Sequence, residues 1–113
     1  MTAETDLVKA CLSYLELCGA FVWRNNSGQL RDRTGRPVRF GKVGSADIIG
    51  VWTDGKFLAV ECKIGRNTPT AQQDAFLDAV AAHGGHAIVA RSVDDIVEWA
   101  ACDNGTPQPC KNG

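Results

Sequence analysis

The 113-residue sequence predicts an α/β fold, because stretches with helical spacing alternate with stretches of strand-forming residues. Apolar residues at helical spacing, with a capping threonine before them and glycine after them, indicate helices over Thr2–Cys18 and Thr70–His83. Between these helices, Ala46–Trp52 and Phe57–Ile64 flank a turn at Thr53-Asp54-Gly55. Two such runs around a short turn are typical of a β-hairpin, so we expect helices packed on a sheet.

Shorter elements complete this prediction. Phe21–Trp23 is expected to form a short buried strand, and His86–Ala90 another. Ser92 with Asp95 is a capping pattern ahead of a short helix, Val93–Ala101. We see neither an internal repeat nor a linker, and therefore expect one domain over residues 1–102 and a flexible tail over residues 103–113.

The composition is that of an ordinary soluble protein, with 44% apolar and 22% charged residues. No apolar run approaches the roughly 18 residues of a membrane span, and the start, MTAETD, lacks the features of a signal peptide. We therefore expect a cytoplasmic protein that makes no membrane contact. A formal net charge of −1 gives no overall nucleic-acid signal, so any affinity for DNA must come from a local cluster.

The five cysteines are odd in number and form no CxxC pair, which argues against a disulfide framework and against a zinc site. Cys11 and Cys18 fall on the apolar stripe of the first helix, where we expect buried free thiols. His83 and His86 flank a glycine turn without partners at ligand spacing. We expect these histidines at the surface and at a strand start.

A basic cluster lies in residues 24–42, which hold one acid, Asp32. Its cationic residues are Arg24, Arg31, Arg33, Arg36, Arg39 and Lys42. Thr34-Gly35 suits a turn, and Arg36–Phe40 could be a strand returning from it. Guanidinium groups match phosphate oxygens in geometry, so we expect this segment to contact a phosphate backbone. The alternative is a solvated hairpin.

Two acids and a lysine stand in the central strand pair. Asp47 opens the first run, and Glu61 and Lys63 are two residues apart, on the same face of the second. Paired carboxylates are ligands that Mg²⁺ or Mn²⁺ accepts, and the main-chain carbonyl of Cys62 could add another. Lys63 could orient or deprotonate a water, or stabilise a pentavalent phosphorus. The alternatives are a turn cap for Asp47 and a simple ion pair between Glu61 and Lys63.

Two further polar residues are expected to face inward from helix starts. Glu4 lies three residues before Leu7, and Gln73 lies three residues before Phe76. Interaction with the helix dipole could explain Glu4, and a capping box with Thr70 could explain Gln73. The joint placement of five polar groups from four segments nevertheless favours a site, and thus a metal-dependent phosphodiesterase.

These residues resemble the virus-type replication-repair nuclease (VRR-NUC) branch of the PD-(D/E)xK superfamily. The matching motifs, in order, are Glu4, Gly44-Ser45-Ala46-Asp47, Glu61-Cys62-Lys63, Thr70-Ala71-Gln72-Gln73 ahead of Phe76, and Gly84-Gly85 followed by a strand and Arg91-Ser92. The resemblance covers the chain from about Glu4 to Trp99. Ala46 stands where the family has a proline, and the adjacent Gln72 remains an alternative to Gln73.

The resemblance implies a restriction-endonuclease-like αβββαβ core, with a central mixed sheet flanked by helices, and Mg²⁺- or Mn²⁺-dependent cleavage of DNA. By this likeness Asp47, Glu61 and the Cys62 carbonyl bind the metal, Lys63 is catalytic, and Glu4 (through water) and Gln73 support the site. It also implies a homodimer acting on branched DNA such as four-way junctions, in the cytoplasm of a bacterial or phage-infected cell. The alternatives are a DNA-binding or assembly module with weak or no catalysis, and a small domain whose charges are structural ion pairs.

Overall fold

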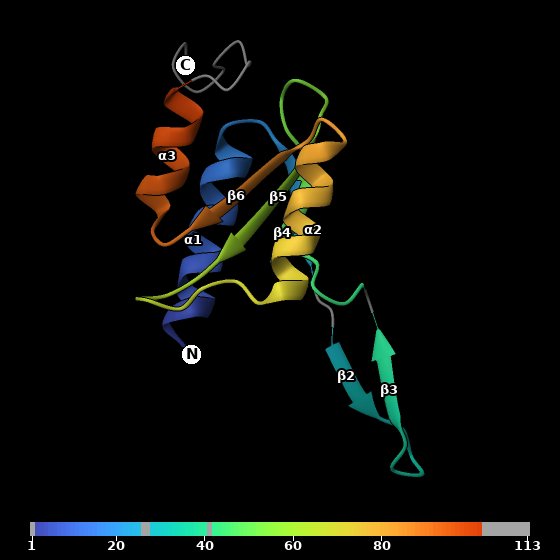
Figure 1. Cartoon of the computed structure of the whole chain (residues 1–113). Helices are drawn as coiled ribbons and strands as arrows, with labels where there is room; N and C mark the ends of the chain where they lie inside the picture. Colours follow the sequence, from blue (N-terminus) through green and yellow to red (C-terminus); the bar gives the residue numbers. More distant parts are fainter. Residues whose placement is uncertain (1, 26–27, 41, 103–113) are drawn as a thin grey trace.

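The computed structural model describes residues 2–25, 28–40 and 42–102, which form a four-stranded mixed sheet flanked by helices and a separate two-stranded hairpin (Figure 1). The predicted tail over residues 103–113 lies outside this range. In chain order the elements are α1 (Ala3–Leu17), β1 (Phe21–Arg24), β2 (Gly28–Arg31), β3 (Pro37–Phe40), β4 (Ile48–Val51), β5 (Phe57–Cys62), α2 (Ala71–Ala82), β6 (His86–Ala90) and α3 (Val93–Ala101).

The main sheet has the strand order β1-β4-β5-β6. β4 pairs antiparallel with both β1 and β5, whereas β6 runs parallel to β5 and is reached through α2. The predicted hairpin of β4 and β5 is confirmed, and its turn is closed by a hydrogen bond from the Trp52 N–H to the Lys56 carbonyl at 2.8 Å. A parallel neighbour needs a crossover connection, and α2 supplies it.

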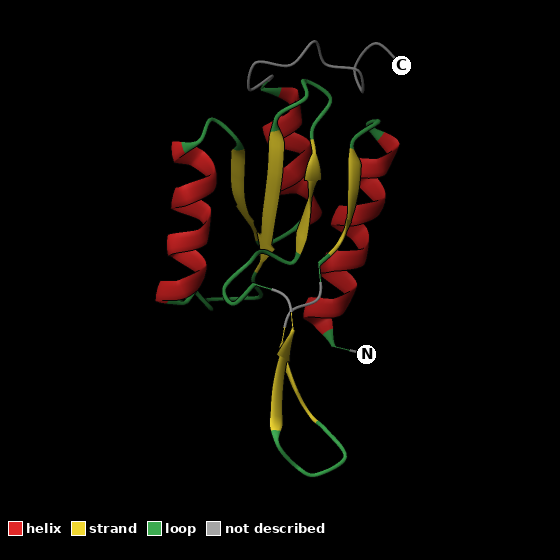
Figure 2. Ribbon diagram, turned by 90° about the vertical axis from the view of Figure 1, so that its right-hand side faces the viewer, coloured by secondary structure: helices red, strands yellow, loops and turns green. Residues whose placement is uncertain are grey.

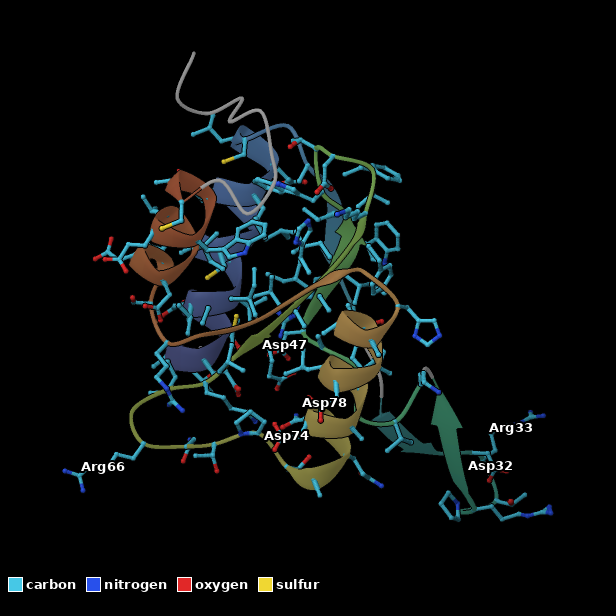
Figure 3. All side chains as sticks on the ribbon, turned by 45° about the horizontal axis from the view of Figure 1, so that its top comes forward. Asp32, Arg33, Asp47, Arg66, Asp74 and Asp78 are labelled. Carbon is cyan, nitrogen blue, oxygen red and sulfur yellow. The ribbon has the colours of Figure 1, made fainter. Side chains whose placement is uncertain are left out.

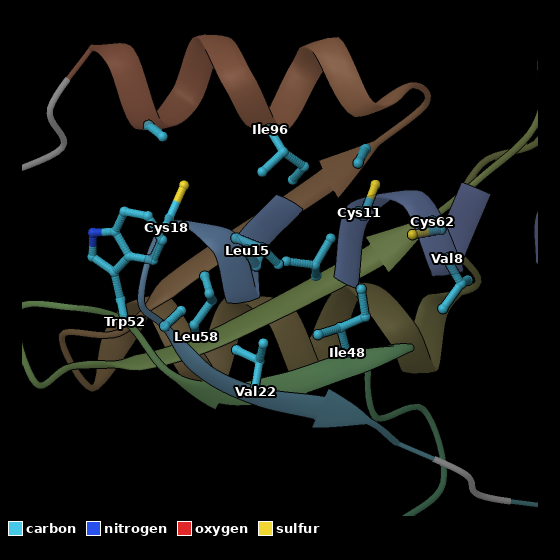
Figure 4. Packing of buried hydrophobic residues seen from close by; sticks show 14 of the residues in the cluster. Val8, Cys11, Leu15, Cys18, Val22, Ile48, Trp52, Leu58, Cys62 and Ile96 are labelled. Atoms are coloured by element: carbon cyan, nitrogen blue, oxygen red, sulfur yellow. The ribbon is translucent and has the colours of Figure 1, made fainter. Parts of the chain in front are cut away.

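The sheet lies between two helical layers, with α1 and α3 on one face and α2 on the other (Figure 2). The larger core cluster joins α1 and α3 to the sheet through fully buried side chains such as Leu15, Ile48 and Ile96 (Figure 4). A smaller cluster lies under α2, where Leu77 and Val80 pack on small sheet residues. Burial of these apolar faces is the main stabilising contribution to the fold.

The expectation of a buried strand at Phe21–Trp23 is wrong for two of its three residues. Val22 is buried, but Phe21 is 72% and Trp23 44% exposed. β1 is an edge strand, and the contacts of α2 with the sheet are made to β5 and β6, so one face of β1 has no helix over it. The side chains on that face therefore stay in solvent.

The helix starts follow the predicted capping chemistry in two of three cases. Thr2 accepts a hydrogen bond from the Thr5 N–H, and Thr70 forms a complete capping box with Gln73. The prediction is wrong for Ser92, whose side chain makes no cap hydrogen bond. The Asp95 carboxylate instead accepts the main-chain N–H of Arg91 at 2.7 Å, so the side chain that stabilises this turn is that of the acid.

β2 and β3 form an antiparallel hairpin, which we call the arm, and the arm projects away from the sheet (Figures 1 and 2). The predicted turn and returning strand are thus confirmed. At its tip, Asp32 accepts hydrogen bonds from the N–H groups of Thr34 and Arg36 and from the Thr34 hydroxyl. The hydrogen bond from the Thr34 side chain is the main cause that holds the pKa of Asp32 below its ordinary value.

Two of the core cysteines contact each other beneath the end of β5. Cys11 and Cys62 are buried free thiols, as expected for Cys11, and their side chains are hydrogen-bonded to each other (Figure 4). Cys18 is buried but disulfide-bonded, so the expectation of a free thiol is wrong for Cys18. Within the described residues, no helix has the length and apolarity needed to cross a membrane.

Gly50 allows β1 to approach β4 closely. A Cβ at Gly50 would lie 2.1 Å from the carbonyl oxygen of Phe21, and φ at Gly50 is +155°. We predict that Gly50→Ala lowers the free energy of unfolding by about 3 kcal/mol, because main-chain atoms cannot yield as a flexible side chain would. Urea titration measures this value.

Gly55→Ala is the matched control. Gly55 also has a positive φ, +87°, but an added Cβ there has no heavy atom within 4 Å. Its cost should be only the backbone strain of about 1 kcal/mol. Equal destabilisation by the two substitutions would contradict the close approach as the cause.

Candidate active site

Asp47 and Lys63 lie at the same end of the central strands β4 and β5. Asp47 immediately precedes β4 and Lys63 immediately follows β5, and the register pairs Ile48 with Val60. Oδ2 of Asp47 accepts the main-chain N–H of Cys62 at 2.8 Å, which ties this carboxylate to β5. Figure 3 shows Asp47 near α2, in keeping with the packing of the preceding Ala46 in one cluster with Leu77 of that helix.

Asn25 clamps the other side of Asp47. The Asn25 N–H donates to the carbonyl of Asp47 at 2.7 Å, and its side-chain amide donates to Ser45 Oγ at 2.6 Å and to the Ala46 carbonyl at 2.9 Å. These bonds hold the Gly44–Asp47 loop at the base of the arm. The position of the Asp47 carboxylate is therefore fixed from two neighbouring strands.

Glu61 is the buried acid of this site, with 1% of its surface exposed. Its Oε2 lies 3.4 Å from Nζ of Lys63, while its Oε1 is buried without any hydrogen-bond partner among the described residues. Burial raises the pKa of Glu61 to about 7; the charges of Asp47 and Glu4 add to this rise, and Lys63 opposes it. A buried carboxylate oxygen without a partner is costly unless a cation or proton occupies it.

The Cys62 carbonyl points toward the side of β5 on which Asp47 lies. The N–H of Lys63 donates to the Ala90 carbonyl on β6 at 3.0 Å, and none of the described peptide bonds is cis. In a trans peptide the carbonyl is directed opposite to the N–H, so the Cys62 carbonyl points away from β6 and toward the side of Asp47. The Cys62 carbonyl and the Asp47 carboxylate thus lie on the same side of β5.

Contrary to what their spacing predicts, the side chains of Glu4 and Gln73 do not both point into the site. Glu4 is exposed in the first turn of α1, so the expectation that it faces inward is wrong, although its charge still reaches Glu61. The side-chain oxygen of Gln73 accepts the N–H of Thr70 at 2.9 Å in the capping box. The structure therefore shows the alternative considered for Gln73, a capping box with Thr70.

The first turn of α2 nevertheless lies against the site loop. Gly44 has φ +82°, and a Cβ at this position would lie 2.7 Å from the carbonyl oxygen of Gln72. Gln72 itself is exposed, whereas Gln73 is half-buried. The contact at Gly44 brings the start of α2 next to the segment that ends in Asp47.

The basic cluster is not gathered beside the carboxylates. Arg33 and Arg36 are exposed at the remote tip of the arm, and Arg31 and Arg39 lie in the arm strands, with side chains outside the described part of the structure (Figure 3). The separation arises because β2 and β3 pair only with each other in the described sheets. Arg24 and Lys42, both exposed, lie near the base of the arm.

Sequence reasoning missed two polar interactions that span the fold. The Asn25 clamp joins residues 20 or more positions apart, and its only sequence signal is an asparagine directly after a strand. Nε2 of His86 lies 2.7 Å from Oδ2 of Asp54, and the imidazole makes an edge-on contact with Trp99 at the far end of the sheet. His86 begins β6, as predicted, but its side chain also pairs with Asp54, which the sequence did not predict.

The fold and site define an α/β protein with two carboxylates, a lysine and a main-chain carbonyl at one sheet edge. Comparison with models of known protein families finds no match, and comparison with curated proteins finds none either. Within residues 2–25, 28–40 and 42–102, no group of three or more histidine, cysteine, aspartate and glutamate side chains stands at metal-holding distances.

The site residues fit a divalent cation that prefers oxygen ligands. The unpartnered Oε1 of Glu61, the Asp47 carboxylate and the Cys62 carbonyl are oxygen donors of the kind that Mg²⁺ and Mn²⁺ accept, together with water. A cation there would also remove the cost of ionising the buried Glu61.

Glu61 should make stability depend on pH. Its pKa rises from 4.5 to about 7 on folding, so the folded chain binds more protons than the unfolded chain between these values. Without divalent cations, this residue should therefore lower the free energy of unfolding by on the order of 3 kcal/mol as pH rises through that window. Below the window both states are protonated, and above it the loss is complete.

The measurement is urea unfolding in EDTA across this pH range, for the wild type and Glu61→Gln. The amide keeps the shape and cannot ionise, so the difference between the two proteins isolates Glu61 from Asp32 and Asp54, whose pKa values are lowered. The variant should gain stability relative to the wild type as pH rises. A difference that stays constant with pH would contradict the raised pKa.

Proposed function

We propose that this chain is a divalent-cation-dependent DNA endonuclease whose site comprises Asp47, Glu61, the Cys62 carbonyl and Lys63. The observation that carries the proposal is the buried Glu61, whose Oε1 has no described partner and whose Oε2 contacts Lys63. A carboxylate pair at a sheet edge beside an amine supplies the groups that phosphodiester hydrolysis needs.

The order of elements supports the same proposal. Without the arm and the final helix α3, the chain runs α1-β1-β4-β5-α2-β6, which is the αβββαβ order of the restriction-endonuclease-like core. The motifs that resemble VRR-NUC nucleases fit this order, because Asp47 directly precedes β4, Glu61 lies in β5 and Lys63 directly follows it. We therefore include membership of this nuclease group in the proposal.

Each residue has a role that its surroundings support. Asp47 and Glu61 hold the cation, which when bound would activate water and neutralise charge on the phosphate. Lys63, with 13% of its side chain exposed beside Glu61, can orient the attacking water or stabilise charge on the phosphoryl oxygens. Glu4 can support the cation through water from the edge of the site.

The arm gives the proposed nuclease a means of holding duplex DNA. A two-stranded ribbon fits the major groove, and exposed Arg33 and Arg36 are at its tip. The paired strands of the arm, Gly28–Arg31 and Pro37–Phe40, are four residues long, or about 13 Å, which corresponds to roughly four base pairs. The arm would therefore contact the duplex well away from the bond that is cut.

We extend the proposal to branched DNA, such as four-way junctions, and to a homodimer. Two sites related by a two-fold axis can cut two strands of a symmetric substrate, which one small domain cannot do in a single encounter. The arm would hold one duplex segment of such a substrate while the site acts near the branch.

Cleavage assays test the proposal directly. Purified protein is incubated with labelled four-way junction, flap, linear duplex and single-stranded DNA, in Mg²⁺, Mn²⁺ or EDTA. We expect cleavage of branched DNA with either cation and none in EDTA. Lys63→Ala should slow cleavage by about 10²- to 10³-fold, because it removes a group that acts on the reacting phosphate.

The matched control is Lys9→Ala, which removes a lysine from the exposed side of α1 and should leave the rate unchanged. Mn²⁺ should also raise the melting temperature of the wild type but not of Glu61→Gln, a readout that does not depend on activity. The proposal would be contradicted if the wild-type protein cut none of the substrates, or if Lys63→Ala cut as fast as the wild type. DNA binding without cleavage would instead indicate a binding module.

The arm makes a separate prediction about salt. If Arg33 and Arg36 each contact a phosphate, Arg33→Ala with Arg36→Ala should reduce the slope of log affinity against log salt by about 1.8 for linear duplex. Fluorescence anisotropy in EDTA measures the slope, and Lys9→Ala again serves as the control. An unchanged slope in the double variant would show that the arm does not touch the backbone.

A further inference from the structure

A groove runs along one side of α2, on the same face of the sheet as the site. It consists of two adjoining cavities of about 500 and 320 Å³, which share Lys42, Phe76 and Ala79. The larger cavity reaches the β4–β5 turn at Lys56 and Phe57, and the smaller reaches Gln72 in the first turn of α2. Such volumes are in the range of small-ligand sites.

The groove is suited to an anion. Lys42 and Lys56 are exposed cations at its wall, His83 lies at its far end, and none of the described lining residues is an acid. Asp54 is nearby in sequence, but its carboxylate is engaged by His86 and by the N–H of Lys56. The positive side chains therefore face the groove without a carboxylate in its wall.

The groove also offers aromatic surface. Phe57 is 42% exposed and Phe76 is half-buried, and both line the larger cavity. An aromatic face left in water beside cations suits a ligand that is itself a flat ring attached to a phosphate. Unpaired nucleobases bind in this manner, stacked on aromatic side chains with their phosphates held by lysines.

The direction of β5 links the groove to the site. Phe57, Ala59 and Glu61 alternate onto one face of the strand, and Ala59 packs in the cluster beneath α2. Phe57 is four residues from Glu61, about 13 Å along the strand. The smaller cavity extends the groove to Gln72, whose carbonyl meets the Gly44 loop that leads into Asp47.

We propose that this groove binds unpaired nucleotides of the DNA strand next to the cleavage site, with bases against Phe57 and Phe76 and phosphates on Lys42 and Lys56. The inference rests on the proposed nuclease function and, among branched substrates, favours those with unpaired nucleotides at the branch, such as flaps. In a duplex the base faces are stacked on one another, so only an unpaired segment can present them to a side chain.

The test is binding of a short fluorescein-labelled oligothymidylate in EDTA, where no cleavage interferes, measured by anisotropy. Lys56→Glu and Phe57→Ala should each weaken binding about tenfold, the effect of losing one stacking or phosphate contact. Lys9→Glu and Leu17→Ala make matched changes at exposed positions of α1, across the sheet, and should bind as wild type does. Circular dichroism and melting temperature confirm that each variant folds.

These binding measurements test the groove independently of DNA cleavage. Oligothymidylate binding that is absent in the wild type, or equal in wild type and groove variants, overturns the inference even if branched DNA is cut. Loss of binding in both groove variants supports it even if the wild type cuts nothing, in which case the nuclease proposal fails instead. If sedimentation shows that Phe57→Ala splits a dimer while oligothymidylate affinity is unchanged, the groove is a subunit interface and the inference is wrong.

Discussion

The antiparallel pairing of β4 with β5 is the constraint on which the rest of the site depends. With Ile48 opposite Val60, Asp47 reaches the N–H of Cys62, and Glu61 lies under α2 rather than in the core beneath α1. A slip of one residue would turn every side chain of a strand to the other face. It would place Glu61 among the apolar residues around Cys11 and would break the hydrogen bond between Asp47 and the Cys62 N–H. The register is thus both a packing constraint and a chemical one.

Burying the Glu61 carboxylate is electrostatically unfavourable, and the stability of the rest of the fold offsets this cost. Glu61 is buried near the charges of Asp47 and Glu4, and its Oε2 lies 3.4 Å from Nζ of Lys63. Holding such a group in place requires a rigid surround, and the Asn25 clamp, the Asp47–Cys62 bond and the close packing at Gly44 provide one. Natural sites commonly trade stability for this kind of preorganisation.

Local signals explain what the sequence could predict. The helices, the β4–β5 hairpin and the grouping of Asp47, Glu61 and Lys63 all depend on periodicity, caps and one short turn, which act over a few residues. The exposure of Phe21 and Trp23 depends instead on where α2 lies on the sheet, and the bonds of Asn25 and His86 join distant segments. Glu4 shows the limit of spacing arguments, because an inward helical position in a first turn can still extend beyond the sheet into solvent.

The arm leaves and rejoins the sheet at neighbouring points, since Arg24 pairs with Ile48 and the Asn25 N–H bonds the Asp47 carbonyl. Its strands pair only with each other in the described sheets, so no packing in the core depends on its length. Insertions or deletions there carry a small entropic cost and leave the carboxylates where they are. The reach and charge of the arm can therefore evolve independently of the carboxylates at its base.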